Sequence, residues 1–257
     1  MVFTPSTTLH VLNLMGAHLP LLQVLRIEEA LLRADSRNWL VLYPGPPTPT
    51  IVLGISGRVE RLVHVGAARA AGARALRRFT GGGTVVADAG TVFVSLCMGR
   101  GSAAGHPQFP REIMAWSREF YEPVFRHLLR PSVHSFSIEE NDYCAGDLKF
   151  GGNAQAVSRD RWVHHTSFLW SICPAHMGLL KVPEKRPAYR RDRPHEEFLT
   201  CLADLCPPGA TPASLPQALL AHLQGQAPHL ALVHASLEEA LLALPKNERC
   251  SNEVVDL

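Results

Sequence analysis

The sequence lacks three features that assign chains to common classes. No apolar run reaches the ~18 residues that a membrane-spanning helix needs. The first 25 residues contain neither Lys nor Arg, which argues against a secretory signal and an arginine-rich transit peptide. The cysteines form no Cys-x-x-Cys pair and no zinc-like group with histidine. They stand at Cys97, Cys144, Cys173, Cys201, Cys206 and Cys250. We expect free thiols in a reducing compartment, most of them filling the core.

The chain also lacks a large net charge. The 257 residues carry a formal charge of +2, so no broad basic field exists for nucleic acid or for a membrane surface. A hydrophobic content of 46% is enough for a sizeable core. The length fits one large domain, or one domain with a small appendage.

A glycine-rich segment is the most informative feature that is present. Arg77 and Arg78 precede Phe79, Thr80 and three consecutive glycines, 81–83, and Thr84-Val85-Val86 follow. Backbone N–H groups of glycines close around an anion, and arginine supplies the countercharge, so the segment indicates a phosphate cradle. It is neither a Walker loop nor the dinucleotide-binding fingerprint. The alternative is a flexible hairpin corner beside two solvated arginines.

A second segment strengthens the phosphate hypothesis. Lys149 lies two residues before Gly151-Gly152, and Asn153, Ala154 and Gln155 follow. Near glycines a substrate approaches the backbone closely, and the lysine is placed to neutralise a developing phosphate or carboxylate charge.

The two segments together resemble the signatures of the lipoate–protein ligase family. Arg77–Asp88 resembles the first signature; Lys149–Gln155 followed by His164–Ser167 resembles the second, with Asn141-Asp142 just upstream. The order and spacing agree, and the resemblance runs from about Leu14 to Leu205. Trp116, Asn141–Tyr143 and Pro187–Arg190 are most similar to the plant-type branch, whose relatives suggest mitochondria. The amino terminus shows no targeting peptide, so we expect a mitochondrial or cytoplasmic location.

The resemblance implies ATP, Mg²⁺ and lipoate as ligands, and attachment of lipoate or octanoate to an acceptor lysine through an acyl-adenylate. Lys149 is then the catalytic residue, which touches both phosphate and acyl carbonyl. The residues implied for the nucleotide are Arg78, Gly83, Thr84, Val85, Val86 and Lys149. Those implied for lipoate are Lys149, Gly81, Gly82, Gly152, Asn153, Ala154 and His165. Asp142 is a weaker candidate for Mg²⁺, which prefers carboxylate and phosphate oxygens.

Partners follow from the same resemblance. The acceptor is a lipoyl-domain protein, either a glycine-cleavage carrier or a 2-oxoacid dehydrogenase E2. Only about 50 residues follow Cys206, too few for a further core. We therefore expect residues 1–206 to form the catalytic domain and 207–257 a short helical extension without a full accessory domain. A separate accessory subunit, or the acceptor, would then complete the adenylation site.

For several side chains the sequence leaves two possible roles open. Neighbouring strand residues point to opposite faces, so only one of His164 and His165 can face the site. Glu28 and Glu29 are expected to form salt bridges, with bracing of the arginines as the alternative. Trp162, Phe168 and Trp170 are expected to be core or tunnel wall.

The pattern along the chain predicts an α/β (α+β) fold with a mostly antiparallel or mixed sheet and packed helices, the character of the biotin/lipoate protein ligase catalytic fold. Strands are expected at Leu9–Leu14, Trp39–Tyr43 and Thr50–Leu53. Hairpins are expected to pair Thr84–Ala87 with Thr91–Met98, and Phe150–Val157 with Trp162–Trp170. Helices are expected at Leu21–Leu32, Val65–Ala75, Pro110–Leu129, Leu215–Leu223 and Leu237–Leu244, with frayed residues at the end.

Three other functions stay open from the sequence. An octanoyl or lipoyl transferase would use a cysteine nucleophile, and neither Cys144 nor Cys173 stands where that nucleophile is expected. A biotin ligase would carry a Gly-Arg-Gly-Arg type loop in place of the triple glycine. A non-catalytic relative would only bind a lipoyl domain or a nucleotide.

Overall fold

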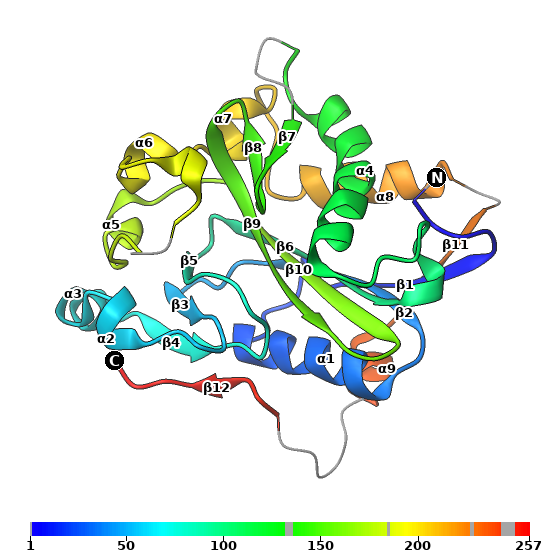
Figure 1. The fold of residues 1–257 in the computed structure, drawn as a ribbon, viewed down its shortest axis with the longest axis horizontal. Coiled ribbons are helices and arrows are strands. Elements are labelled where there is room, and N and C mark those ends of the chain that lie inside the picture. The colour runs from blue at the N-terminus through cyan, green and yellow to red at the C-terminus, as the bar shows by residue number, and fades with distance from the viewer. Residues whose placement is uncertain (1, 132–135, 184–185, 227–228, 243–249) are drawn as a thin grey trace.

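Two β-sheets form the framework of the computed structural model (Figure 1). The structure describes residues 2–131, 136–183, 186–226, 229–242 and 250–257. The large sheet has eight strands in the order β11-β1-β2-β6-β10-β9-β8-β7. The small sheet has four strands in the order β12-β4-β3-β5. The expectation of a mixed α/β fold is confirmed.

The large sheet is parallel at one edge and antiparallel elsewhere. β1 pairs in parallel with both β11 and β2, and the remaining strand pairs are antiparallel. The strands are β1 (Thr7–Asn13), β2 (Asn38–Pro44), β6 (Thr91–Gly99), β7 (Phe136–Glu139), β8 (Asp142–Ala145), β9 (Leu148–Val157), β10 (Arg161–Leu169) and β11 (Leu230–His234). β9 and β10 form the expected hairpin, closed where Ser158 N donates to Arg161 O.

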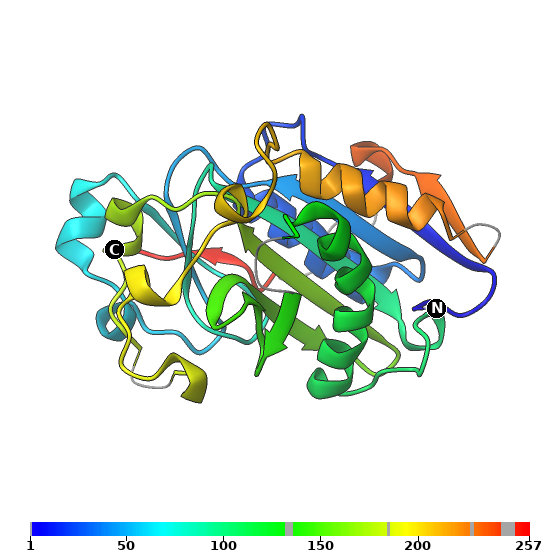
Figure 2. The same cartoon turned by 90° about the horizontal axis from the view of Figure 1, so that it is seen from above.

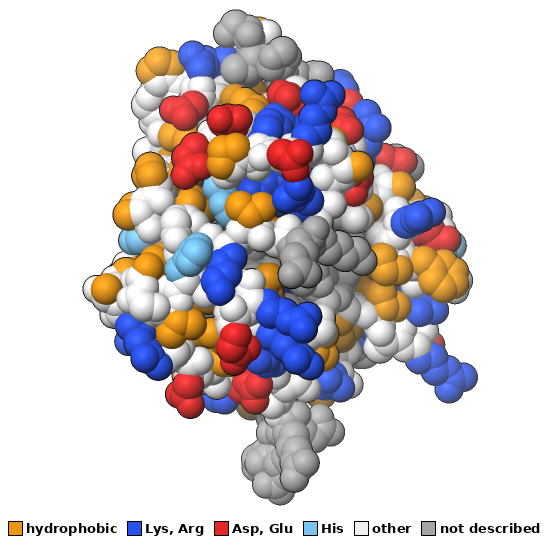
Figure 3. Space-filling view, turned by 60° about the vertical axis from the view of Figure 1, so that its left-hand side comes forward, with side chains coloured by type: hydrophobic (Ala, Val, Ile, Leu, Met, Phe, Trp, Pro, Cys, Tyr) orange, Lys and Arg blue, Asp and Glu red, His pale blue; other side chains and the backbone are white. Residues whose placement is uncertain are grey.

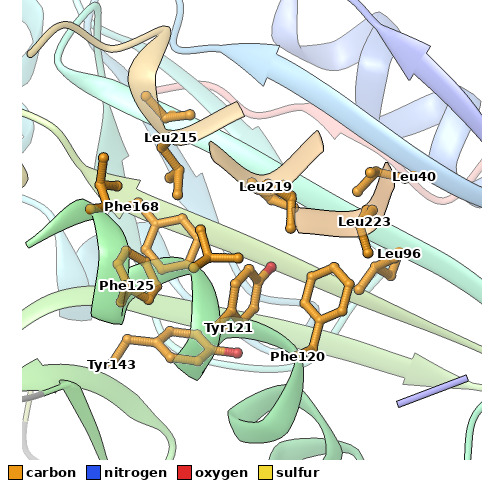
Figure 4. Close-up of a cluster of buried hydrophobic side chains, with 14 of the residues drawn as sticks. Leu40, Leu96, Phe120, Tyr121, Phe125, Tyr143, Phe168, Leu215, Leu219 and Leu223 are labelled. Carbon is orange, nitrogen blue, oxygen red and sulfur yellow. The ribbon is translucent and has the colours of Figure 1, made fainter. Parts of the chain in front are cut away.

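Helices bury both faces of this sheet, so its central strands are apolar almost throughout. α4 (Pro110–Leu128) and α8 (Ser214–Gln224) lie next to each other on one face (Figures 1 and 2). Leu40 and Leu96 point to that face and pack with an aromatic cluster from α4 and the sheet (Figure 4). α1 (Leu21–Ala34) covers the other face, where Trp39 and Phe93 are buried. Because successive side chains point to opposite faces of the sheet, each strand contributes residues to two separate cores, one on each face.

The small sheet corrects one predicted hairpin. β5 (Val85–Ala87) follows the glycine segment as expected, but it pairs with β3 (Thr50–Leu53) and not with β6. The turn at Asp88 is present, since Thr91 N donates to Asp88 O. It carries the chain from the small sheet to the large one. The turn residues were therefore recognised correctly, and the partner strand was wrong.

The helix expected at Val65–Ala75 is too long. α3 covers Val65–Ala70, and Gly72 follows with a φ of +62°, a left-handed conformation that ends helices and suits glycine. Arg74–Arg77 then forms β4, paired in parallel with β3. Sheet pairing of Arg74–Arg77 thus outweighs the helical propensity of the alanine-rich segment.

Short helical segments connect the sheets. They are α2 (Val59–Leu62), η1 (Arg100–Ser102), α5 (Pro174–Met177), η2 (Ala188–Arg190), α6 (His195–Phe198) and α7 (Leu202–Leu205). No helix within the described ranges is long and apolar enough to cross a membrane.

The residues after Cys206 contribute more than helices. α8 and α9 (Leu237–Leu241) confirm the two expected helices, and Ser236 and Glu239 form the expected capping box; positions 243–244 of the second lie outside the described residues. The strands β11 and β12 (Glu253–Val254) were not predicted. β12 pairs with β4, so the expectation of a frayed end is wrong for the described residues 250–257.

Asn252 explains why this end is ordered. Its side chain is 1% exposed. The amide nitrogen donates to Leu25 O at 3.0 Å and to Glu29 Oε2 at 2.8 Å, and the amide oxygen accepts from Phe79 N at 3.1 Å. One side chain therefore ties α1 to the segment that leads into the glycine loop.

We predict that Asn252→Ala lowers the free energy of unfolding by about 1–3 kcal/mol, because three buried hydrogen bonds are lost and Phe79 N is left without its acceptor. Urea denaturation followed by circular dichroism measures this change. Asp256→Ala, at an exposed position that makes no ion pair among the described residues, should change stability by less than about 0.5 kcal/mol. Equal stability of Asn252→Ala and wild type would contradict the anchoring role.

Candidate functional site

A cavity of about 950 Å³ lies where the two sheets meet. Its wall takes residues from α1, from β3 and β5 of the small sheet, and from β6, β9 and β10 of the large sheet. The segment from α5 to α6 closes one side with Met177, Arg190 and Phe198. This volume is within the range of small-molecule sites.

The glycine segment forms one wall of the cavity, and Arg78 organises it from inside. Arg78 is 4% exposed. Its Nη2 donates to Gly81 O at 3.1 Å and Gly83 O at 2.7 Å, and its Nη1 to Val52 O at 3.2 Å. Gly82 has a φ of +107°, and a Cβ there would lie 2.9 Å from Arg78 Nη2. Only glycine fits between this guanidinium and the loop.

The charge of Arg78 has no carboxylate partner among the described residues, and its Nε lacks a hydrogen-bond partner there. Burial lowers its pKa to about 10. The guanidinium therefore remains a cation at neutral pH, and its positive potential acts on the cavity beside it.

Lys149 lies on a second wall, at the start of β9. Its Nζ forms an ion pair with Asp142 Oδ1 at 2.7 Å. The Tyr189 hydroxyl donates to the other oxygen, Oδ2, at 2.9 Å. A Cβ at Gly152 would lie 3.1 Å from Lys149 Nζ, so the absence of a side chain there leaves the ammonium group room. Asp142 thus orients the lysine, and a small shift would free either charge for a ligand.

The two adjacent histidines face opposite sides of β10, as the period of two predicts. His165 lines the cavity, and its Nδ1 donates to Glu28 Oε2 at 2.9 Å. Ser95 Oγ donates to Glu28 Oε1 at 2.6 Å. Nδ1 therefore carries a proton, and Nε2 is left for a ligand.

His164 belongs to the opposite core. The Tyr143 hydroxyl, 2.7 Å from His164 Nε2, donates to Ser117 Oγ, and Ser117 Oγ donates to Met114 O. Since the tyrosine proton is used by Ser117, Nε2 must carry the proton that joins the two rings. His164 is thus a neutral residue of the core and is not among the residues that line the cavity.

Part of the cavity wall is apolar. The side chains there are Leu21 and Leu25 of α1, Val52 of β3, Phe93 of β6 and Leu169 of β10. Phe93 packs against the ring of His165 with centroids 5.0 Å apart. An apolar chain would be covered by these side chains, with His165 as the polar group among them.

The structure brings together every site residue predicted from the sequence. Each lines this one cavity: Arg78, Gly81, Gly82, Gly83, Thr84, Val85, Val86, Asp142, Lys149, Gly152, Asn153, Ala154 and His165. The assignment of these residues to nucleotide, lipoate or metal is a separate matter, taken up below.

The structure decides two alternatives that the sequence left open for side chains near the site. Trp162, Phe168 and Trp170 are core and not tunnel wall, because they point to the α4 face. Neither Glu28 nor Glu29 braces Arg77 or Arg78. Glu29 forms a salt bridge with Arg33 at 2.9 Å, and Glu28 binds His165.

Much of the wall was not predicted from the sequence. Leu25 and Phe93 would have been found by following the helical and strand periods from Glu28 and Ser95, which share their faces. Other cations of the wall follow no such period. They come from two segments far apart in the sequence, one at α2 and one between α5 and α6, and comprise Arg58, Arg61, Lys181, Arg186 and Arg190. Figure 3 shows Lys and Arg side chains above and below the centre of this side of the molecule.

The cysteines take no part in the site. Along the part of the wall that the structure describes, none of the lining residues is a cysteine. Burial raises the pKa of Cys144 to about 11, and that of Cys97 above its usual range. Both therefore stay thiols at neutral pH. The described residues also contain no group of three or more His, Cys, Asp or Glu side chains arranged to hold a metal ion.

Comparison with known proteins assigns the family. Residues 20–224 match the lipoyl protein ligase A/B catalytic domain. Because the match covers most of the chain, the protein belongs to this family, as its two signatures suggested.

The curated relatives are distant. The chain is 28% identical over 186 residues to the inactive lipoate–protein ligase 2 of Plasmodium falciparum, covering 60% of this chain and 48% of that protein. It is also 28% identical over 166 residues to a putative lipoate-protein ligase A of Aeropyrum pernix, covering 62% and 57%. The chain spans about half the length of the curated relatives it matches.

Solved structures share the fold. A lipoate-protein ligase A bound with ATP matches with a TM-score of 0.69 at 18% identity, over 93% of this chain and 92% of that one. A bi-partite lipoate protein ligase described with its E2 lipoyl domain, from Thermoplasma acidophilum, matches with a TM-score of 0.69 at 21% identity, over 94% and 90%. At these identities the likeness concerns the fold.

The burial of His164 leads to a prediction about pH. Burial, aided by His165, lowers the His164 pKa from 6.5 to about 3. Between these values the unfolded chain binds a proton that the folded chain does not, so stability falls as the pH falls through this window. His164→Gln removes that proton. Its free energy of unfolding should therefore fall less steeply between pH 6 and pH 4, by up to about 1.4 kcal/mol per pH unit.

Urea denaturation at a series of pH values measures these slopes. His18→Gln, at an exposed position, is the matched control and should keep the wild-type slope. A His164→Gln slope equal to that of wild type would show that His164 is not a neutral core residue.

Proposed function

We propose that the protein is a lipoate–protein ligase, which attaches lipoate or octanoate to a lysine of an acceptor lipoyl domain through an acyl-adenylate. The observation that carries this proposal is the convergence of the Arg78 glycine loop and Lys149 on one cavity with an apolar end. Related folds bound with ATP and with lipoic acid support the choice of ligands.

The two ends of the cavity suit the two substrates. The apolar end, with Leu25, Phe93 and His165, would take the acyl chain, close to Gly152, Asn153 and Ala154. The segment Gly83–Val86 would wrap the nucleotide, with Arg78 behind it, and Gly81 and Gly82 would contact the acyl group. Lys149 lies between these ends, where the carboxylate of the acyl chain meets the α-phosphate. Its ammonium group would reduce the repulsion between the two anions and hold them in line.

In this mechanism the acyl carboxylate attacks the α-phosphorus, and pyrophosphate leaves. The acceptor lysine then attacks the acyl carbonyl, and AMP leaves. Arg78 and Lys149 stabilise negative charge in both steps, since a phosphate oxyanion persists throughout. No residue of the chain needs to become acylated, which agrees with a cavity wall built without cysteine in its described part.

Asp142 is the residue that would hold Mg²⁺. Its carboxylate is the acidic group beside Lys149, and Mg²⁺ is usually bound by one or two carboxylates together with substrate phosphates. The ion would neutralise phosphate charge when bound. Asp142 would then exchange its ion pair with Lys149 for the metal, which releases Lys149 toward the substrate.

A relative described as inactive makes a non-catalytic binding protein the second candidate. Two observations favour activity. Arg78 binds the carbonyls of Gly81 and Gly83 and so shapes the loop, and Lys149 is aligned by Asp142, which Tyr189 holds in turn. A transferase with a cysteine nucleophile is disfavoured, because burial raises the pKa values of Cys97 and Cys144.

Two proteins are proposed as partners. The acceptor is a lipoyl domain of a 2-oxoacid dehydrogenase E2 or of a glycine-cleavage carrier. A similar structure described as a bi-partite ligase with its E2 lipoyl domain supports both this acceptor and an accessory subunit. The accessory subunit or the acceptor would cover the exposed cations Arg58, Arg61 and Arg186 and exclude water during adenylation.

We predict that Lys149→Ala lowers the rate of acyl transfer about 10²–10³-fold, because it removes one cation that stabilises the reacting phosphate. Intact mass spectrometry of the acceptor measures the rate, and thermal melting by circular dichroism checks folding. Arg159→Ala, on the exposed turn between β9 and β10, is the control and should keep wild-type turnover. Near-normal transfer by a folded Lys149→Ala variant would remove the catalytic role.

The function itself is tested with an apo E2 lipoyl domain and two acyl donors. One donor is lipoate with MgATP, and the other is preformed lipoyl-adenylate. We expect rapid transfer from the adenylate and slow transfer from lipoate with ATP unless an accessory subunit is added. Equal rates from both donors would show that no partner is needed. Failure of the adenylate to modify either acceptor class would reject the ligase and leave the binding protein.

A further inference from the structure

Arg190 is a buried cation that neither signature contains. It ends the η2 turn, one residue after Tyr189, and it is 4% exposed. The residue lines the cavity. Its Nε donates to Arg193 O at 3.1 Å, and its guanidinium carbon lies 4.7 Å from the centre of the Phe198 ring. The side chain is therefore fixed in position before any ligand binds.

Arg190 has no ion-pair partner among the described carboxylates, although Asp142 lies close enough to act on its charge. Its neighbours have carboxylate partners: Arg193 pairs with Asp147 at 2.9 Å, Arg186 pairs with Asp192, and Lys149 pairs with Asp142 at 2.7 Å. Arg190 makes no ion pair with a described carboxylate, and its buried Nη2 has no hydrogen-bond partner there. Burial and the charge of Arg186 lower its pKa. An anion in the cavity would supply both the missing charge and the missing acceptor.

The position of Arg190 indicates which anion this is. Tyr189, the residue before Arg190, donates its hydroxyl to Asp142 Oδ2 at 2.9 Å, and Asp142 Oδ1 pairs with Lys149 Nζ at 2.7 Å. Arg190 and Lys149 therefore lie on the same side of the cavity. His165, at the apolar end, belongs to a separate hydrogen-bonded group with α1 and β6. Arg190 thus lies with the Lys149 group, which the proposed function places at the phosphates.

We propose that Arg190 binds the β- and γ-phosphates of ATP, and the pyrophosphate that leaves, at a subsite beyond Lys149. This rests on the proposed function in taking ATP as the nucleotide and in placing its phosphates beside Lys149. The planar guanidinium donates to two phosphate oxygens at once, and the stack on Phe198 keeps one edge directed to the cavity. Arg78 and Arg190 thus bind opposite ends of the nucleotide.

The backbone beside Arg190 supports a built subsite. Arg191 follows with φ +56° and ψ −137°, a conformation that residues other than glycine rarely adopt. This reversal turns the chain at the point where Arg190 enters the cavity. Arg193 then folds back and donates to Tyr189 O and Arg190 O. The strained backbone at Arg191 therefore helps to set the direction in which the Arg190 side chain enters the cavity.

Isothermal titration calorimetry of the full chain with MgATP and with AMP tests the subsite. Arg190→Met keeps the apolar stack on Phe198 and removes the charge, and Arg190→Lys keeps the charge and loses the planar fork. We expect Arg190→Met to weaken ATP binding about 10- to 100-fold, the range for loss of a charged hydrogen bond. AMP binding should stay within about 2-fold of wild type. Arg190→Lys should recover only part of the ATP affinity.

Arg159→Met is the matched control, because Arg159 is an exposed arginine on the turn between β9 and β10 and does not line the cavity. It should leave the ratio of ATP to AMP affinity unchanged. Equal weakening of ATP and AMP by Arg190→Met would overturn the proposal, since Arg190 would then act on the α-phosphate or on the fold. Unchanged ATP affinity would also overturn it, as would a loss confined to lipoate binding. Should Arg190→Met not fold, Arg190→Lys carries the same comparison.

Transfer from preformed lipoyl-adenylate separates this proposal from the proposed function. Arg190→Met should keep wild-type transfer, because that step involves no β- or γ-phosphate. If wild type modifies no acceptor but Arg190→Met still loses ATP selectively, the ligase proposal fails and the subsite stands. If wild type modifies the acceptor and Arg190→Met binds ATP normally, the reverse holds.

Discussion

The buried guanidinium of Arg78 is the interaction on which the site depends. It binds carbonyl oxygens on both sides of Gly82 and the carbonyl of Val52, so it joins the glycine loop to the small sheet. A loop with three glycines would otherwise populate many conformations, and a ligand that fixed one of them would bind more weakly because of the entropy lost. The contacts of Arg78 fix the loop during folding, so this entropy is lost before a ligand binds. The charge of Arg78 then acts through the loop as well as on the ligand.

The second wall uses a different means of preorganisation. Lys149 is held by an ion pair and not by burial, and the partner Asp142 is itself held by Tyr189. An ion pair of this kind exchanges readily when a stronger anion or a cation arrives. The cavity therefore has one rigid cation in Arg78 and one adjustable cation in Lys149. A reaction in two steps, with different leaving groups, benefits from this difference.

Much of this arrangement could be predicted from the sequence. The glycine segment, Lys149 and the parity of His164 and His165 were identified from residue type and spacing, because these depend on local rules of backbone geometry. The pairing of β5 could not be identified, since the turn at Asp88 is compatible with either sheet and only the position of β3 decides.

Arg190 was also missed. Its role depends on a loop that returns to the site from a distant part of the chain, and no periodicity describes that contact. The strand β12 was overlooked because it is polar, and its order comes from Asn252.

The contacts of Asn252 link the end of the described chain to the glycine loop. The Asn252 amide oxygen accepts from Phe79 N, which belongs to the residue directly after Arg78. Docking of residues 250–254 and binding of an anion at the glycine loop therefore share one backbone group, and any coupling free energy between them is reciprocal. An anion bound beside Arg78 would slow amide exchange in β12, although the strand lies outside the cavity wall. The rate of amide exchange in β12 would thus report whether the site is occupied.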